Sequence, residues 1–308
     1  MGVQWPSFTK TFHHTTYPAI DPTRPELSAK GKTVLITGAG SGIGRATAIA
    51  FAQAQAHVVV LTGRQEVTLA ETRRIMESQS TETIVNVRVM DATQPESVDT
   101  VFREVSENFG PIDICIHGAS HLAEKGKLYE SSVDNFWTSV EANVKSSFVI
   151  NHAFTNQSNT NAQDRVLIFM NSCLAHIDAL SQKTAPASYA ISKLAQAKLV
   201  EYSAADMEHD KSFRVYAVHP GVVVTAMSDR SIAMAPPGTR EALNWDSPEL
   251  PGQFFVWLAS MEGRCIPSGK YLWANWDVEE LEARKDEIWS NPLALTQTMH
   301  GWPFEYLG

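Results

Sequence analysis

The sequence predicts an α/β fold in which helices cover both faces of a doubly wound, Rossmann-like parallel sheet. Seven short apolar runs alternate with longer amphipathic segments from residue 32 onward, and a glycine-rich turn follows the first run. This alternation is typical of parallel sheets, because each right-handed crossover carries a helix across one face of the sheet. Strands buried on both faces are apolar throughout, which accounts for the runs of Val and Ile.

Each apolar run has the length of a buried strand, and six of the seven are rich in Val or Ile. The expected strands cover residues 33–37, 57–62, 84–90, 113–117, 166–170, 213–218 and 270–273. The helices expected between them cover residues 44–55, 65–78, 95–109, 133–154 and 188–207.

Two segments fall outside this alternation. Residues 1–30 are polar, carry four prolines and show no clear periodicity, so we expect an extended arm laid over the surface of a single Rossmann-like domain at 31–308. Residues 226–251 interrupt the alternation with several Met, Pro and Gly residues. A loop of that length inside a compact domain is usually functional, and we expect it to form a lid.

The composition excludes several classes of protein. A chain of 308 residues with 44% hydrophobic and 19% charged residues suits a soluble protein with a sizeable core. The net charge of -9 and the lack of a basic run argue against nucleic-acid and anionic-membrane partners. The N-terminus lacks the pattern of a secretory signal, so we expect a cytoplasmic protein. The three cysteines form no C-x-x-C pair, and no metal site is predicted.

The glycine-rich turn at 37–44 follows the first expected strand and opens a helix. Glycines let the backbone approach a pyrophosphate, and the helix N-terminus supplies free N–H groups and partial positive charge. The alternative is a tight turn that needs positive φ and holds no ligand. The candidate cofactor contacts in this turn are Gly38, Ser41, Gly42, Ile43 and Gly44.

The ends of the second and third strands bear on the identity of the cofactor. The second strand ends without a carboxylate that could bind a ribose 2′-hydroxyl, and Arg64 could instead pair with a 2′-phosphate. NADP is therefore favoured over NAD, unless Arg64 is only a solvated residue at a helix start. Asp91 could accept a hydrogen bond from the adenine amino group, or it could be an ordinary turn residue.

Tyr189 and Lys193 are spaced so that a phenol and an ammonium share one face of a helix. A free tyrosine, with a pKa near 10, is a poor acid or base at neutral pH. A nearby cation lowers the pKa of the phenol by favouring phenolate, so that proton transfer becomes feasible without a metal.

With these motifs in order along the chain, the sequence resembles the short-chain dehydrogenase/reductase family, and specifically its fungal members. The matching pieces extend from residue 32 to about 275, and segments 17–22 and 274–281 also look like fungal members. The pieces are 37–44, Asp91, Asn143, Ser172, Tyr189 with Lys193, and 219–225.

The resemblance implies a role for each matching residue. Tyr189 would be the general acid or base, and Lys193 would lower its pKa and hold the nicotinamide ribose. Ser172 would bind the substrate oxygen, and Asn143 would anchor a water that carries protons to Lys193. The nicotinamide end of the cofactor would lie against Pro220, Gly221, Val223 and Thr225.

Two features depart from the family pattern. The usual Asn-Asn-Ala-Gly after the fourth strand is replaced by His117, Gly118, Ala119 and Ser120. The first three are still expected at the cofactor, although the Asn that normally supports the sheet is missing. Tyr189 follows Ser172 by 17 residues, a longer gap than is typical. Asn171 is the neighbouring candidate if the register of the strand differs by one residue.

The resemblance implies an NADP(H)-dependent oxidoreductase that interconverts a ketone and a secondary alcohol on a mostly apolar small molecule, in fungal specialised metabolism. A redox-silent isomerase or cyclase and a non-catalytic NADP-binding regulator are the alternatives. We expect a homodimer or homotetramer formed through helices 133–154 and 188–207. The tryptophans late in the chain could pack the C-terminal region or line a substrate pocket.

Overall fold

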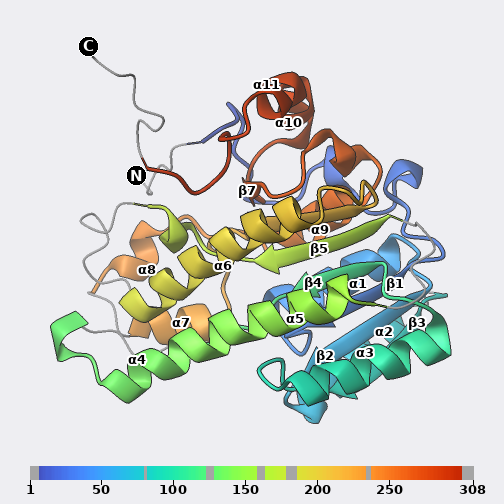
Figure 1. Cartoon of the computed structure of the whole chain (residues 1–308), viewed down its shortest axis with the longest axis horizontal. Helices are drawn as coiled ribbons and strands as arrows, with labels where there is room; N and C mark the ends of the chain where they lie inside the picture. Colours follow the sequence, from blue (N-terminus) through green and yellow to red (C-terminus); the bar gives the residue numbers. More distant parts are fainter. Residues whose placement is uncertain are drawn as a thin grey trace.

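A seven-stranded parallel sheet forms the centre of the molecule (Figure 1). The computed structural model describes residues 7–79, 82–122, 128–157, 164–177, 186–233 and 237–299. The strand order is β3-β2-β1-β4-β5-β6-β7. The direction of winding reverses between β1 and β4, which creates a crevice at the carboxyl ends of these neighbouring strands. The predicted doubly wound α/β fold is confirmed.

Every observed strand begins and ends within one residue of its predicted position. The strands are β1 (Thr33–Thr37), β2 (Val58–Gly63), β3 (Ile84–Val89), β4 (Ile114–His117), β5 (Arg165–Met170), β6 (Phe213–His219) and β7 (Tyr271–Trp273). One expectation was wrong, because β3 is not a buried strand. It lies at the edge of the sheet, and its terminal residues Ile84 and Val89 are 44% and 53% exposed.

Helices cover both faces of the sheet. On one face α1 packs against α2 and α9, and on the other α5 lies between α3 and α6 (Figure 1). The helices are α1 (Gly42–Gln53), α2 (Glu66–Ser78), α3 (Pro95–Phe109), α4 (Val133–Val140), α5 (Ser146–Thr155), α6 (Ala187–Asp206), α7 (Ala226–Ala233), α8 (Thr239–Ala242), α9 (Glu249–Ala259), α10 (Val278–Ala283) and α11 (Lys285–Ser290). In the described part of the chain, none of these helices has the length and apolar character needed to cross a bilayer.

The helix expected at 133–154 is not a continuous α-helix. Its α-helical halves, α4 and α5, are separated by one turn of π-helix at Glu141–Lys145. A π-turn inserts an extra residue into the helix, and such turns are frequent at functional sites. This turn contains Asn143, one of the predicted site residues.

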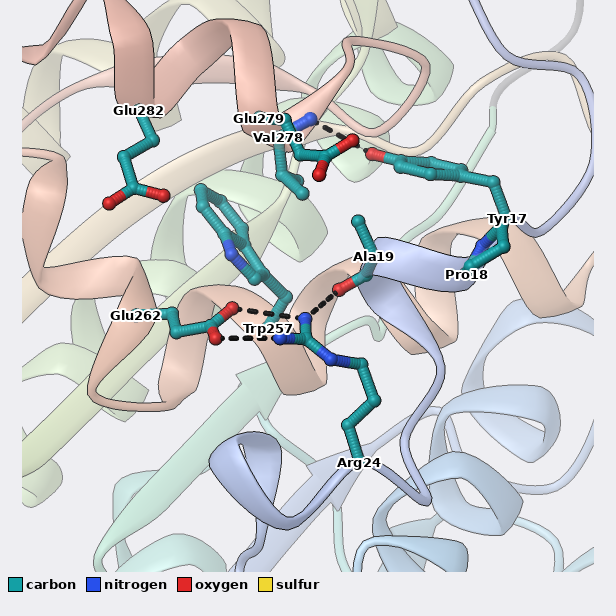
Figure 2. Close-up of a pocket in the computed structure, with 9 residues that line it drawn as sticks. All are labelled: Tyr17, Pro18, Ala19, Arg24, Trp257, Glu262, Val278, Glu279 and Glu282. Atoms are coloured by element: carbon teal, nitrogen blue, oxygen red, sulfur yellow. Dashed lines mark hydrogen bonds and ion pairs between the residues drawn. The ribbon is translucent and has the colours of Figure 1, made fainter.

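The N-terminal arm is not simply laid over the surface. Two short 3₁₀ turns, Pro18–Ile20 and Pro25–Leu27, each end in a side chain that is fully buried in the core. Figure 2 shows the Arg24 guanidinium between the carbonyl of Ala19 and the carboxylate of Glu262, which it reaches at 2.9 Å. The arm is therefore attached by apolar burial and by an ion pair, and its boundary at residue 30 stays a prediction.

The expected lid also differs from a long loop. Its described part contains α7 and α8, and its last residues belong to α9. Leu250 and Pro251 are buried, and Gly252 in α9 approaches Ala46 in α1 so closely that a Cβ would lie 3.1 Å from the Ala46 backbone. Residues 234–236 lie outside the described residues. The C-terminal end of the predicted lid is therefore part of the helical layer.

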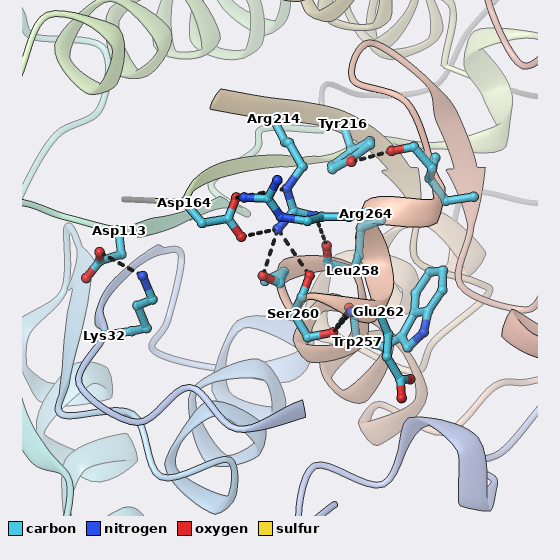
Figure 3. A network of polar contacts seen from close by, with 12 residues as sticks. Lys32, Asp113, Asp164, Arg214, Tyr216, Trp257, Leu258, Ser260, Glu262 and Arg264 are labelled. Carbon is cyan, nitrogen blue, oxygen red and sulfur yellow. Dashed lines mark hydrogen bonds and ion pairs between the residues drawn. The ribbon is translucent and has the colours of Figure 1, made fainter. Parts of the chain in front are cut away.

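A buried ion cluster connects the sheet to α9 at the amino-terminal edge of the strands. Figure 3 shows the Asp164 carboxylate between the guanidinium groups of Arg214, at 2.7 Å, and Arg264, at 2.8 Å. Arg214 also donates to the carbonyl oxygens of Leu258, Ala259 and Ser260. Carbonyls at a helix C-terminus lack helical partners, so this arginine satisfies them. The cluster lies at the opposite edge of the sheet from the predicted site.

Candidate active site

The carboxyl ends of β1, β4 and β5 lie side by side, and the predicted site residues surround them. Gly38 and Gly42 in the turn after β1 have φ values of +72° and +51°, which favour glycine. A Cβ at Gly44 would lie 2.2 Å from the Gly38 carbonyl oxygen, so only glycine permits this approach of helix and strand. A Cβ at Gly42 would lie 3.0 Å from the Thr225 methyl group, which brings the segment after β6 to the same turn.

The N-terminus of α1 is open to an anion. The residue before the helix, Ser41, is exposed and makes no side-chain cap to α1. The first backbone N–H groups of a helix have no partner within the helix and carry partial positive charge. The turn can therefore hold a phosphate in the way the sequence predicts, and Ile43 lies half-buried in the first helical turn.

Arg64 is exposed immediately after β2. Within the part of the chain that the structure describes, its guanidinium makes no hydrogen bond or ion pair. Burial lowers the pKa of His121, and the Arg64 charge adds to this effect and also helps to lower the pKa of Asp91. The Asp91 carboxylate accepts hydrogen bonds from the backbone and hydroxyl of Thr93 at 2.9 and 2.8 Å, and the backbone bond is the main cause of its lowered pKa. Asp91 thus organises a turn and retains a second oxygen for other contacts.

His117 occupies the position where the family usually has an Asn. Its Nδ1 lies 2.9 Å from the Thr37 hydroxyl, and its Nε2 lies 3.2 Å from the Ser146 hydroxyl. The Thr37 oxygen in turn accepts from the backbone N–H groups of Gly118 and Ala119. Burial lowers the pKa of His117 to about 3, so the ring is neutral. Both ring nitrogens support the sheet, and contact of this segment with a cofactor stays a prediction.

Tyr189, Ser172 and Lys193 meet at the carboxyl end of β5. The hydroxyls of Ser172 and Ser120 both form hydrogen bonds with the Tyr189 phenol. Burial raises the pKa of the phenol to about 12, and the two hydrogen bonds oppose this increase. The Lys193 Nζ lies 5.6 Å from the centre of the Tyr189 ring. The register of β5 therefore places Ser172, rather than Asn171, next to Tyr189.

Lys193 is almost fully buried. Its Nζ donates to the Met170 carbonyl at 2.7 Å, and burial lowers the pKa of the ammonium to about 7. Desolvation disfavours a charged amine, so a lysine in this place is more easily deprotonated than one in water. The pKa of a buried lysine therefore depends strongly on the charges and hydrogen-bond acceptors around it.

Asn143 connects the π-turn to two other segments. Its Oδ1 accepts from the His121 backbone at 2.7 Å and from the Ser120 hydroxyl at 3.0 Å. Its Nδ2 donates to the His121 carbonyl and to the Ser192 hydroxyl, both at 2.9 Å. The side chain therefore fixes the segment after β4 against α6, and its role as the anchor of a water stays a prediction.

The segment after β6 is held in place by a carboxylate that the sequence did not reveal. Gly221 has a φ of +93°, and Asp246 accepts from the Val222 N–H at 2.5 Å while its own N–H donates to the Val222 carbonyl. The other oxygen of Asp246 lies 2.5 Å from His14 of the N-terminal arm. The predicted contacts Pro220 and Val223 are buried in this same segment.

Sequence reasoning also missed Ser120 as a partner of Tyr189 and Gln196 as a partner of Lys193. Gln196 follows Lys193 by three residues, a spacing that puts both on one helix face and could have indicated it. Among the late tryptophans, Trp257, Trp273 and Trp276 are buried in the core, whereas Trp289 is 59% exposed and Trp302 lies outside the described residues.

The sequence profile of the short chain dehydrogenases matches residues 32–235, well over half of the chain. The chain belongs to the short chain dehydrogenase family. These enzymes are oxidoreductases that bind a nicotinamide cofactor, and the family resemblance seen in the sequence is confirmed.

The similar sequences come from fungi. A short chain dehydrogenase of Monascus purpureus is 32% identical over 290 residues, which cover 93% of this chain and 94% of that protein. A short chain dehydrogenase/reductase of Aspergillus novofumigatus is 28% identical over 294 residues, which cover 94% of this chain and 96% of that protein. The chain is thus placed among fungal short chain dehydrogenases.

Solved structures share the fold. A dehydrogenase/reductase of Sinorhizobium meliloti superposes with a TM-score of 0.70 and 24% identity over 81% of this chain and 95% of its own. A Shigella flexneri protein solved in complex with NADP superposes with a TM-score of 0.69 and 22% identity over 82% of this chain and 99% of its own. At these identities the likeness concerns the architecture alone.

Proposed function

We propose that this short chain dehydrogenase is an NADP(H)-dependent oxidoreductase that interconverts a ketone and a secondary alcohol on a mostly apolar small molecule. The observation that carries the proposal is the meeting of Ser172, Tyr189 and Lys193 at the edge of the sheet where the uncapped N-terminus of α1 also lies. A phenol, a hydroxyl and an ammonium together can bind a carbonyl oxygen and deliver a proton to it.

Each side chain has a defined part in this chemistry. In reduction the Tyr189 hydroxyl donates its proton to the substrate oxygen, and in oxidation the phenolate takes the proton back. The Ser172 hydroxyl hydrogen-bonds the same oxygen, and the Lys193 ammonium favours the phenolate by its charge. A nicotinamide bound beside them supplies or accepts the hydride.

The pKa values of Tyr189 and Lys193 explain why the lysine must be charged for proton transfer. Burial raises the pKa of Tyr189 to about 12 in the chain alone, too high for a base at neutral pH. Lys193, whose pKa burial lowers to about 7, is poised between its two charge states. Catalysis therefore requires that the site hold Lys193 in its ammonium form beside the Tyr189 phenol.

The cofactor is proposed to be NADP, held through its phosphates by the turn after β1 and through its 2′-phosphate by Arg64. Arg64 is exposed, and no described residue pairs with it, so its guanidinium is available for forked hydrogen bonds to a phosphate. The NADP complex of the structurally similar Shigella flexneri protein supports this choice. The remaining proposed contacts are Asp91, the backbone of 117–119, and the segment 220–225.

We also propose a cytoplasmic homodimer or homotetramer that acts in fungal specialised metabolism, as the fungal relatives suggest. Large apolar side chains on the two long helices are exposed, as expected for surfaces that a second copy would cover. They are Trp137, Phe148, Ile191 and Leu194. Light scattering at micromolar concentration should give at least twice the 34.0 kDa mass of one chain, and a monomer would contradict the proposal.

Turnover tests the proposed activity. The protein is incubated with NADPH and a panel of apolar ketones, and NADPH consumption is compared between wild type, Tyr189→Phe and the control Tyr202→Phe. Tyr202 lies on the same helix but is 68% exposed. We expect loss of turnover with retained NADPH binding in Tyr189→Phe only. Consumption that persists in Tyr189→Phe would refute the assigned role, and binding without turnover in wild type would favour a regulator or a redox-silent enzyme.

A further inference from the structure

Beneath the proposed catalytic residues lies a network of uncharged polar side chains that the proposed chemistry does not use. They come from the end of β5, from α5, from α6 and from β7, and all are buried. The members are Asn171, Ser147, Gln196 and Tyr271, which are 2%, 0%, 1% and 6% exposed. Buried polar groups are costly unless they are hydrogen-bonded, so their arrangement is tightly constrained.

Gln196 is at the centre of this network. Its Oε1 accepts from the Lys193 Nζ at 3.2 Å and from the Asn171 Nδ2 at 3.0 Å. Its Nε2 donates to the Ser147 hydroxyl at 2.7 Å. Because an ammonium can only donate, the oxygen of the Gln196 amide must face Lys193, and the orientation of the amide is fixed by its partners.

The partners of Gln196 lead directly to the other site residues. Asn171 donates to the Lys193 carbonyl at 2.9 Å, and its Oδ1 accepts from the Ser172 N–H at 2.7 Å and from the Tyr271 hydroxyl at 3.3 Å. Ser147 donates to the Asn143 carbonyl at 2.6 Å. Gln196 is therefore one hydrogen bond from Lys193 and two from both Ser172 and Asn143.

We infer that Gln196 is a positioning residue, which holds the Lys193 ammonium in its charged form and fixes Ser172 and Asn143 through Asn171 and Ser147. The inference rests on the proposed function for its catalytic meaning. The contact between Gln196 and Lys193 can be tested without turnover.

The chemistry of an amide suits this place. An apolar side chain would leave the Lys193 Nζ with the Met170 carbonyl as its acceptor, and the ammonium would be held less well. A carboxylate would form an ion pair with Lys193 and compete with the phenolate for its charge. A neutral acceptor stabilises the ammonium and leaves that charge available to Tyr189.

The other titratable groups facing Lys193 are the Tyr189 phenol on α6 and the His117 imidazole at the end of β4, with the Tyr271 phenol of β7 reached through Asn171. Burial is the cause of the lowered Lys193 pKa, and no Asp or Glu of the described chain opposes it. The proton affinity of Lys193 should therefore respond directly to a change at Gln196.

The test measures the Lys193 pKa by NMR in protein labelled with ¹³C at lysine Cε, with the signal assigned through Lys193→Arg. Three variants are compared with wild type: Gln196→Glu, Gln196→Met and the control Ser203→Ala. Ser203 is buried on the same helix and bonds to Asn151, away from the site. We expect Gln196→Glu to raise the Lys193 pKa and Gln196→Met to lower it, each by about one unit, while Ser203→Ala leaves it unchanged.

Unchanged or same-direction shifts in the two Gln196 variants would overturn the inference. If Gln196→Met does not fold, the sign of the Gln196→Glu shift decides alone. The pH profile of kcat/KM is then recorded, and its Lys193-dependent limb should move with the NMR value. The two outcomes can be told apart. If the Lys193 pKa shifts in opposite directions in the two Gln196 variants but the wild-type protein reduces no ketone, the proposed function is refuted and the contact between Gln196 and Lys193 is established.

Discussion

The hydroxyl of Thr37 and the imidazole of His117 lie 2.9 Å apart and join the ends of β1 and β4. The second ring nitrogen of His117 reaches Ser146 on α5, so one buried side chain connects two strands and a helix. This arrangement replaces the support that the family usually obtains from an Asn. It also places the Thr37 oxygen where it orders the backbone of the segment after β4.

Removal of this link should destabilise the protein. His117→Ala removes one hydrogen bond from each of the Thr37 and Ser146 hydroxyls and opens a cavity in the core, and we expect a loss of about 2–4 kcal/mol in the free energy of unfolding. Urea denaturation measures the change. The exposed His57 provides the control, and His57→Ala should have almost no effect. Equal stabilities of the two variants would show that His117 is not a structural link.

Stability should fall as the pH is lowered below about 6.5. Burial lowers the pKa values of both His117 and His219 to about 3. Between these values and the unfolded value near 6.5, the unfolded chain binds protons that the folded chain does not. Each histidine should therefore cost up to about 1.4 kcal/mol per pH unit in that window.

Urea denaturation at pH 7 and at pH 5 checks this expectation. His117→Asn removes one of these two buried groups and should show a shallower dependence on pH than wild type. A pH dependence that is identical in the two proteins would mean that His117 does not contribute.

Asp246 should contribute to the affinity for NADPH, because it orders the segment proposed to contact the nicotinamide end of the cofactor. It fixes the segment after β6 through Val222 and connects that segment to His14. Asp246→Ala releases both contacts, and we expect roughly tenfold weaker NADPH binding, as for the loss of one charge-assisted hydrogen bond. The control is Asp229→Ala, on the exposed surface of α7, and calorimetric titration gives both affinities. Unchanged affinity in Asp246→Ala would show that the segment holds its shape without it.

The ion cluster at the opposite edge should matter for stability and not for binding. Asp164→Ala leaves the buried Arg214 without its carboxylate, and we expect a loss of about 3–5 kcal/mol in the free energy of unfolding. Glu71→Ala removes an exposed partner of Arg74 and should have almost no effect on stability. Folded Asp164→Ala should bind NADPH as wild type does. A cost as small as that of Glu71→Ala would contradict the buried role.

Much of the fold could be predicted because local pattern and tertiary structure agree. The strands other than β3 are apolar because they are buried on both faces, and the bounds of all seven were predicted within one residue. The position of β3 at the edge depends on the order of strands, which no single run encodes. Tyr189 and Lys193 share a helix face, but this spacing is common by chance. Their position after the fifth strand and the resemblance identified them, and Ser172 was identified through the resemblance.

The remaining differences come from contacts between distant segments. The docking of the arm requires Glu262 and the core around Ile20, and the π-turn at Asn143 accompanies bonds to His121 and Ser192. The partners of Asp246 come from the arm and from the segment after β6. Such pairings between residues far apart in the chain leave no periodic signal, so the sequence alone did not reveal them.

Calorimetric titration with NADPH and NADH tests the central claim most directly. We expect wild type to bind NADPH more tightly than NADH. Arg64→Ala should weaken NADPH binding about 10- to 100-fold, the effect of one charge-assisted contact to a phosphate, and leave NADH binding unchanged. Arg73→Ala, an exposed arginine on α2, serves as the control. If neither nucleotide binds wild type, the turn after β1 is only structural, and the proposed chemistry of Tyr189 is contradicted.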